Sequence, residues 1–230
     1  MRTVGIIGGL GPLAGAYFYR RLIELTPAAD DRDHLPVILL SSPAVPSRIA
    51  HLENRGPSPV PALVEAARAL EQAGADFLVM PSSTTHAYYS DLSRAVSLPW
   101  LNMLDTVSQA TAAQGIARLG ILATTPTVQY RLYDPYLLPL GVAPVYPDPR
   151  SQSEIMAIIG RVKAGGDPTA LGLSLLEIAE RPWADRVPAL LLACTEIPVI
   201  FPQSQWRRQA PLFSATDILA LHTVAWARNP

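Results

Sequence analysis

Two short apolar segments of the sequence each end in a small side chain that can take part in proton transfer or nucleophilic attack. The first segment spans residues 76–82 and ends at Ser82, and the second spans 188–194 and ends at Cys194. Polar residues suited to the start of a helix follow each segment. The two segments lie about 112 residues apart, close to half of the 230-residue chain. The sequence therefore predicts two similar halves, with a hydroxyl and a thiol at equivalent positions.

Cys194 and Ser82 differ in the proton chemistry that they can perform. An unperturbed cysteine has a pKa of about 8.5, and a helix N-terminus and nearby cations can make Cys194 a thiolate at neutral pH. A serine hydroxyl is far less acidic and cannot act as an unaided base. It can still donate or relay a proton, or hydrogen-bond a substrate. We therefore expect the two positions to play unequal parts, which disfavours a symmetrical two-thiol reaction.

A second pair of segments repeats at nearly the same offset. Residues 5–12 and 120–127 each contain an apolar strand, then small residues, then a proline at the start of a helix, and lie about 115 residues apart. Two repeats in the same order favour a duplicated fold. The alternative is that strands of parallel α/β sheets resemble one another in general.

Short, continuously apolar runs alternate with amphipathic helical patterns along the chain, as is typical of parallel strands covered on both faces by helices. The predicted strands are residues 3–8, 36–42, 76–82, 99–103, 118–124, 142–146 and 188–194. The predicted helices are residues 13–26, 58–74, 105–115, 127–138, 152–164, 170–182 and 214–228. We expect an α/β fold of two pseudo-symmetric domains, each with a parallel sheet flanked by helices. The predicted domains are residues 1–105 plus 211–230, and residues 106–210.

Ligands of open α/β sheets bind beyond the carboxyl ends of the strands. All four repeated segments place polar residues at such ends, so we expect the active site in the cleft between the two domains. The predicted lining is Gly8–Pro12, Ser82–His86, Thr124–Thr127 and Cys194–Glu196.

The composition excludes several classes of protein. Hydrophobic residues make up 49% of the chain and the net charge is −1, so we expect a globular protein without a nucleic-acid or membrane partner. A single cysteine excludes an intramolecular disulfide framework, and the four histidines lack metal-ligand spacing, so no metal is expected. No run approaches the roughly 18 apolar residues of a membrane span, and the glycines near the N-terminus favour a strand and turn over a secretion signal. We expect a cytoplasmic protein.

The segment Gly8–Pro12 contains a glycine-rich turn. It lacks the third glycine of a dinucleotide-binding loop, and Pro12 removes a helix N-terminal amide, so nucleotide binding is disfavoured. A turn that lets the backbone approach a small anionic ligand is the better interpretation.

Three segments together resemble one enzyme family, in sequence and in order. They are Gly-Gly-Leu-Gly-Pro at 8–12, Pro-Ser-Ser-Thr-Thr-His at 81–86 and Ala-Cys-Thr-Glu-Ile-Pro at 193–198. The chain resembles the aspartate/glutamate racemase family over nearly its whole length. Members that work without pyridoxal phosphate use two cysteines on opposite faces of the substrate α-carbon. The resemblance places these roles at Ser82 and Cys194, and it implies no cofactor and a homodimer.

The resemblance also implies residues that bind the substrate's side chain. Arg48 matches the family's arginine that binds the side-chain carboxylate of aspartate, and Lys163, the only lysine in the chain, matches the lysine that assists it. From the residues alone, Arg48 can equally be a surface ion-pair partner and Lys163 a solvated helix residue.

Small residues near the strand ends are expected to bind the rest of the substrate: Gly9, Gly11, Pro12, Ser83, Thr84, Thr124, Thr127 and Thr195. The hydroxyls and amides of Thr84 and Thr195 suit binding of the substrate's α-carboxylate. Thr84 and Thr195 can alternatively be ordinary helix caps. His86 and Glu196 are possible supporting residues, although a structural role for His86 is an equal alternative.

Three functions are compatible with these residues. The first is a cofactor-independent racemase for aspartate or glutamate, with Cys194 as base or acid and Ser82 in place of the second thiol. The second is a one-thiol isomerase, decarboxylase or lyase of the same superfamily. The third is a dicarboxylate-binding protein that has lost turnover. In each of them the partner is a small acidic molecule.

Overall fold

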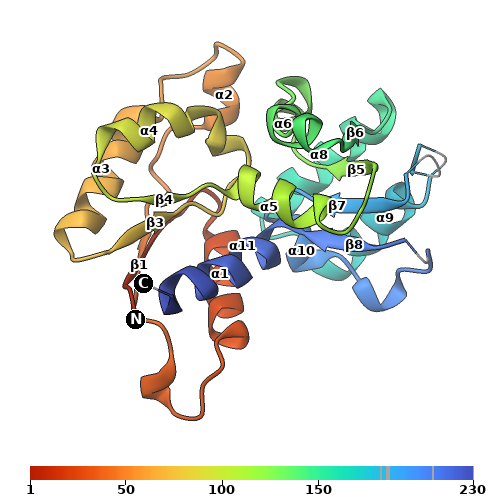
Figure 1. Ribbon diagram of the computed structural model, residues 1–230. Coiled ribbons are helices and arrows are strands. Elements are labelled where there is room, and N and C mark those ends of the chain that lie inside the picture. The colour runs from red at the N-terminus through yellow and green to blue at the C-terminus, as the bar shows by residue number, and fades with distance from the viewer. Residues whose placement is uncertain (182, 185–186, 209, 230) are drawn as a thin grey trace. The chain divides into compact units, whose positions relative to one another are not determined.

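The computed structural model describes residues 1–181, 183–184, 187–208 and 210–229 (Figure 1). The chain divides into two compact units. The first contains Met1–Thr106 and the C-terminal segment from Thr216, and the second contains Val107–Ala215.

The first unit contains a sheet of four parallel strands in the order β2-β1-β3-β4. They are β1 (Val4–Gly8), β2 (Val37–Ser41), β3 (Phe77–Val79) and β4 (Trp100–Leu101). Every residue of the two central strands, β1 and β3, is buried, whereas the edge strand β2 is partly exposed. The continuously apolar runs of the sequence therefore correspond to strands with both faces covered.

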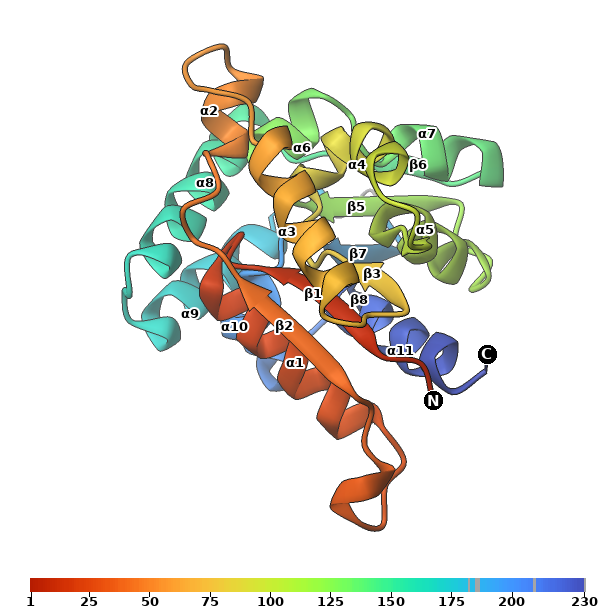
Figure 2. The same cartoon turned by 90° about the vertical axis from the view of Figure 1, so that its left-hand side faces the viewer.

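Helices α1 (Pro12–Leu25) and α3 (Val60–Gln72) cover opposite faces of this sheet (Figure 2). The face under α3 buries Ile7, Leu78 and Met80 against the helix's alanines and leucines. The last helix, α11 (Ala215–Arg228), also packs in the first unit: Trp226 lies edge-on to Phe77, with ring centroids 5.1 Å apart. The remaining helical elements are η1 (Asp31–Asp33), α2 (Arg48–Leu52), η2 (Thr84–Tyr88) and α4 (Tyr89–Ala95).

The second unit contains another sheet of four parallel strands, in the order β6-β5-β7-β8. They are β5 (Arg118–Leu122), β6 (Ala143–Val145), β7 (Ala189–Leu192) and β8 (Leu212–Ser214). Helices α8 (Pro149–Lys163) and α9 (Pro168–Ala179) lie side by side and share one apolar core with Leu122, Leu190 and Leu192. The other helical elements are α6 (Thr125–Gln129), α7 (Asp134–Leu137), η3 (Leu138–Leu140), α10 (Ile197–Ile200) and η5 (Gln203–Gln205). Helix α5 (Met103–Ala112) begins in the first unit and ends in the second.

The two sheets have the same topology, with β1 to β4 corresponding in order to β5 to β8. The predicted α/β fold with two parallel sheets flanked by helices is confirmed.

The two sheets also share a packing contact between a glycine and a leucine. A Cβ on Gly5 would lie 2.7 Å from Leu78 Cδ2, and a Cβ on Gly120 would lie 2.3 Å from Leu190 Cδ2. Each glycine pairs in register with that leucine on the neighbouring strand.

Several predicted elements differ from the structure. The single helix expected at 127–138 is wrong: α6 ends at Gln129, Arg131 has a positive φ of 49°, and α7 starts at Asp134 just before Pro135. Proline at the second position of α7 cannot donate the hydrogen bond that a continuous helix requires there. The helix expected at 170–182 ends at Ala179, and residue 182 lies outside the described residues. None of the described helices is long and apolar enough to cross a membrane.

The glycine–leucine contact in the second sheet can be tested by unfolding. We expect Gly120→Ala to destabilise the protein by about 1–3 kcal/mol, because the new methyl group overlaps Leu190. Leu190→Val should relieve part of that cost in the double variant, as measured by urea unfolding. Gly160→Ala is the matched control, since a Cβ there meets nothing within 4 Å, and it should leave stability equal or higher. Additive costs for Gly120→Ala and Leu190→Val would contradict the proposed contact.

Candidate functional site

Cys194 lies just beyond the carboxyl end of β7, next to the end of β5. The backbone amides of Ala193 and Cys194 both donate to the carbonyl of Leu122, at 2.8 and 3.2 Å. The Cys194 side chain is 4% exposed and packs with the core under α8 and α9. Both the backbone position and the orientation of the thiol are therefore set by the sheet.

A carboxylate and an ammonium group continue from the thiol. Cys194 Sγ donates to Glu196 Oε2 at 3.1 Å, and Lys163 Nζ lies 3.4 Å from Glu196 Oε1. The Glu196 side chain is 5% exposed, whereas that of Lys163 is 37% exposed. Within the described residues Oε1 makes no hydrogen bond, so its contact with Lys163 is an ion pair without a directed hydrogen bond. The thiol thus contacts the carboxylate, which contacts the ammonium group; we call these three residues the Cys194–Glu196–Lys163 series.

This environment keeps Cys194 protonated. Burial raises the pKa of the thiol well above its ordinary value, the charge of Glu196 raises it further, and Lys163 opposes these effects only in part. A nearby cation can favour the thiolate, but here burial and the charge of Glu196 outweigh the effect of Lys163 on the pKa of Cys194. Helix α10 starts three residues after the thiol, contains only four residues and includes Pro198, so it supplies little dipole.

Ser82 lies beyond the end of β3 in the first unit. Its Oγ is 2.7 Å from Thr85 Oγ1. Among the described residues, this neutral hydroxyl is the hydrogen-bond partner of the Ser82 side chain. Thr124 and Thr127 form a similar pair three residues apart at the end of β5, with 3.0 Å between their hydroxyl oxygens. A hydroxyl paired with a hydroxyl is oriented but is not activated as a base.

His86 holds the backbone near Ser82. Its Nδ1 lies 2.9 Å from the Ser82 carbonyl, and its Nε2 accepts from the Met103 amide at 3.0 Å. Because a carbonyl only accepts, Nδ1 carries the proton and Nε2 is the acceptor. Burial lowers the pKa of His86 to about 4, so the ring is neutral at pH 7. Both ring nitrogens contact backbone groups, which favours the structural alternative for this residue.

Arg48, at the start of α2, contacts the backbone of its own unit. Its Nη2 donates to the Leu10 carbonyl at 2.8 Å, and its Nη1 donates to the carbonyls of Pro46 and Val45 at 3.2 and 3.3 Å. The guanidinium therefore ties α2 to the glycine-rich turn. These contacts use donors that the resemblance assigns to a substrate carboxylate.

The glycine-rich turn is tight because the chain approaches itself there. Gly9 has a φ of +81°, and a Cβ at this position would lie 2.3 Å from the amide nitrogen of Ser42. Gly11 is the N-cap of α1 and Pro12 is its first residue. The close approach of Ser42 therefore requires glycine at position 9.

The predicted site residues fall into two groups, one in each unit. The group in the second unit lies at the ends of β5 and β7 and on α8: Thr124, Thr127, Lys163, Cys194, Thr195 and Glu196. The group in the first unit follows β1 and β3 and includes α2: Gly9, Gly11, Pro12, Arg48, Ser82, Ser83, Thr84 and His86. Sequence reasoning missed the buried Gln152, which binds the end of β5 from α8; no motif marks it. No group of three possible metal-ligating side chains occurs in the described residues.

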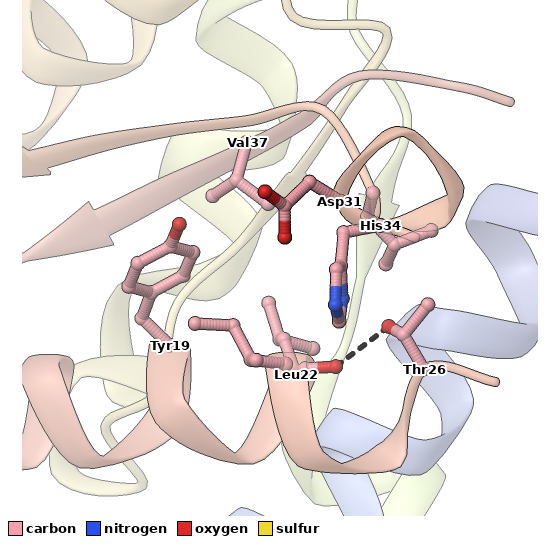
Figure 3. Close-up of a pocket in the computed structure, with 8 residues that line it drawn as sticks. Tyr19, Leu22, Thr26, Asp31, His34 and Val37 are labelled. Atoms are coloured by element: carbon pink, nitrogen blue, oxygen red, sulfur yellow. Dashed lines mark hydrogen bonds between the residues drawn. The ribbon is translucent and has the colours of Figure 1, made fainter. Parts of the chain in front are cut away.

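A cavity of about 300 Å³ lies elsewhere in the first unit, between the C-terminal half of α1 and the start of β2 (Figure 3). Tyr19, Asp31 and His34 contribute its polar atoms, and Leu22 and Val37 contribute apolar surface. Since β2 begins here, the cavity lies near the amino ends of the strands, whereas Ser82 lies beyond their carboxyl ends. It belongs to neither group of predicted site residues.

Known proteins resemble the chain along nearly its full length. A family model described as Asp/Glu/Hydantoin racemase matches residues 7–223. The Broad specificity amino-acid racemase RacX of Bacillus subtilis is 25% identical over 231 residues, which cover 96% of each chain. The structure of Picrophilus torridus aspartate racemase is 30% identical with a TM-score of 0.86, covering 99% of this chain and 95% of that one. An aspartate racemase homologue from Pyrococcus horikoshii shares the fold, with a TM-score of 0.77, 23% identity and full coverage of both chains.

Because the chain has one cysteine, the thiol can be titrated without interference from other thiols. We expect Cys194 to ionise above the ordinary value of about 8.5 when the folded protein is followed by NMR of a ¹³C-labelled cysteine β-carbon. Glu196→Gln should lower the pKa of Cys194, since it removes the neighbouring negative charge, and Lys163→Met should raise it. Identical titrations in all three proteins would contradict the assigned electrostatics.

His86 should make stability depend on pH. Its pKa is lower in the folded state than the ordinary value of 6.5, so its contribution is complete above pH 6.5 and is lost as the pH falls toward 4. The difference corresponds to about 3 kcal/mol. We expect His86→Gln to remove this part of the pH dependence in urea unfolding, and the exposed His222→Gln to retain it. Parallel pH profiles for wild type and His86→Gln would contradict the assignment.

Proposed function

Because the chain belongs to the Asp/Glu/Hydantoin racemase family, we propose that it exchanges the α-proton of an amino acid, with Cys194 as the principal acid–base group and Ser82 acting in place of the second thiol. The observation that carries the proposal is the Cys194–Glu196–Lys163 series at the end of β7. A thiol beside a buried carboxylate is arranged for transfer of one proton.

Glu196 provides a route from the resting thiol to a reactive thiolate. The thiol proton moves to Glu196 Oε2, which is 3.1 Å from Sγ, and leaves the negative charge on sulfur. Lys163 then stabilises the thiolate, since its charge already opposes the raised pKa of Cys194. The thiolate removes the substrate's α-proton as a general base.

Ser82 completes the exchange from the opposite face of the α-carbon. Its hydroxyl donates a proton to the carbanion, and water returns a proton to the oxygen through the Ser82–Thr85 pair. The hydroxide that remains is neutralised through solvent by the proton that Glu196 received from the thiol, which restores the resting enzyme. In the reverse direction Ser82 has no activated base, so inversion is slower from one enantiomer than from the other. The proposed reaction requires no cofactor.

The proposed substrate is an acidic amino acid, aspartate or glutamate. Lys163 is partly exposed, and the similarity to Picrophilus torridus aspartate racemase supports this choice. Arg48 serves as a second carboxylate ligand if it exchanges a backbone carbonyl for the substrate. The proposed substrate-binding residues are Gly9, Gly11, Pro12, Ser83, Thr84, Thr124, Thr127 and Thr195, of which Thr84 and Thr195 are the proposed ligands of the α-carboxylate. The homodimer that the family resemblance implies stays a prediction.

A second candidate is a one-thiol decarboxylase or lyase, and a specific observation favours it. The resting Cys194 is protonated, and such a reaction requires one proton donated to a carbanion without prior removal of an α-proton. In that case Ser82 binds the substrate and takes no part in proton transfer.

The deciding experiment is α-proton exchange in deuterated water, followed by NMR separately for both enantiomers of aspartate and glutamate. We expect exchange with the wild type and at least a hundredfold loss in Cys194→Ser, the scale of a lost general acid–base group. Ser82→Cys should raise the ratio of inversion to exchange, because it supplies a second thiol. Ser174→Cys, on the exposed surface of α9, is the matched control and should leave that ratio unchanged.

Absence of exchange with all four compounds, in a protein that binds them, would overturn the racemase proposal. Exchange without inversion, unaltered by Ser82→Cys, would favour the one-thiol candidate instead.

A further inference from the structure

Helices α6 and α8 contact each other in the second unit, and a groove of about 550 Å³ lies between them. Helix α6 contributes Thr125, Val128 and Gln129, and α8 contributes Gln152, Met156 and Ala157. This volume is within the ~300–1,000 Å³ of small-molecule sites. No function described so far uses the groove.

The groove adjoins the proposed reactive group. Gln152 Nε2 donates a hydrogen bond to the carbonyl of Ala123 at 3.1 Å. Leu122, which precedes Ala123 and ends β5, accepts a hydrogen bond at its carbonyl from the amide of Cys194. On α8, Met156 and Lys163 are seven residues apart, which places them on one helix face about 10 Å apart. The groove therefore lies beside the end of β5, next to the strand end that holds Cys194.

The lining of the groove carries no charged side chain within the described residues. A carboxylate that entered it would lose water without gaining a cation, which is unfavourable. The two cations assigned to a substrate carboxylate are also engaged elsewhere, Arg48 with backbone carbonyls and Lys163 with Glu196. A neutral side chain avoids this cost.

Gln152 adds a preference for a hydrogen-bond donor. The side chain is 8% exposed, and its Nε2 donates to Ala123 O and to Thr125 Oγ1 at 3.1 and 3.3 Å. Since a carbonyl only accepts, this fixes the amide orientation and leaves Oε1 without a partner among the described residues. An amide N–H that reached Oε1 would satisfy a buried acceptor, whereas a carboxylate would be repelled by it.

We infer that this protein also acts on neutral amino acids with a side-chain amide, with glutamine as the lead substrate and its side chain seated in the α6–α8 groove. The inference rests on the proposed α-proton chemistry and extends its substrate class. Glutamine and glutamate are the informative pair, because they have nearly the same shape and differ in charge.

The test is α-proton exchange of glutamine, glutamate and aspartate in the wild type and in variants that fill the groove. Ala157→Trp and Ser153→Trp each place an indole in the groove from an exposed position of α8. We expect exchange of glutamine by the wild type, and a fall of at least tenfold in the glutamine-to-aspartate exchange ratio in both variants. Ala170→Trp, exposed on α9 and outside the groove, is the matched control and should keep the wild-type ratio.

Exchange of aspartate or glutamate but not of glutamine would overturn this inference and leave the proposed function standing. Equal loss of all exchange in the groove variants would also overturn it. If none of these amino acids exchanges its α-proton, the proposed function fails. Calorimetric titration with glutamine then tests separately whether the groove binds glutamine. Binding that Ala157→Trp abolishes and Ala170→Trp retains would support the groove as a glutamine site, and absence of binding to the wild type would exclude it.

Discussion

In each sheet a glycine of one central strand leaves room for a leucine of its neighbour, and this contact sets how closely and in what register the two strands pair. Gly5 and Leu78 form the contact in the first sheet, and Gly120 and Leu190 form it in the second. Ser82 and Cys194 each follow four residues after the leucine of their own strand. The same packing constraint therefore places the hydroxyl and the thiol at equivalent strand ends.

Equivalent positions do not give equivalent chemistry, because the electrostatic surroundings differ. Near Ser82 the structure provides neutral groups: the Thr85 hydroxyl and a neutral His86. Next to Cys194 it provides a buried carboxylate and, behind it, an ammonium group. Only the second arrangement can move charge along a defined line. A change of Ser82 alone thus leaves the halves unequal, since none of the described hydrogen bonds joins the Ser82 side chain to a charged group as Cys194 is joined to Glu196.

The sequence predicts the sheets well because their physical cause is local. A strand covered on both faces must be apolar throughout, as in 4–8 and 189–192, and this pattern is visible without the structure. Short elements are harder, because α2 and α10 contain five and four residues and have too few turns for a period to show. The strand β8 was also missed; it has three residues, of which one is buried.

The sequence predicts that Ser82 and Cys194 follow strands, but it does not predict which groups contact them. The Cys-Thr-Glu segment marks Cys194, yet the raised pKa arises from burial in a core that α8 and α9 complete. The role of His86 depends on the Met103 amide, 17 residues further along the chain.

The contacts of the cations bear most directly on substrate choice. A free arginine or lysine facing a site attracts a carboxylate, but a cation already paired must break that contact first, and only the difference contributes to affinity. Arg48 would give up carbonyl groups, and Lys163 would leave Glu196 uncompensated beside the thiol. An acidic substrate that recruits Lys163 would therefore also raise the pKa of Cys194 and weaken it as an acid at the moment of reaction. A neutral substrate leaves the Cys194–Glu196–Lys163 series intact. In the proposed reaction, side-chain recognition and proton transfer thus compete for one lysine, and the proposed binding of a neutral side chain in the uncharged α6–α8 groove removes that competition.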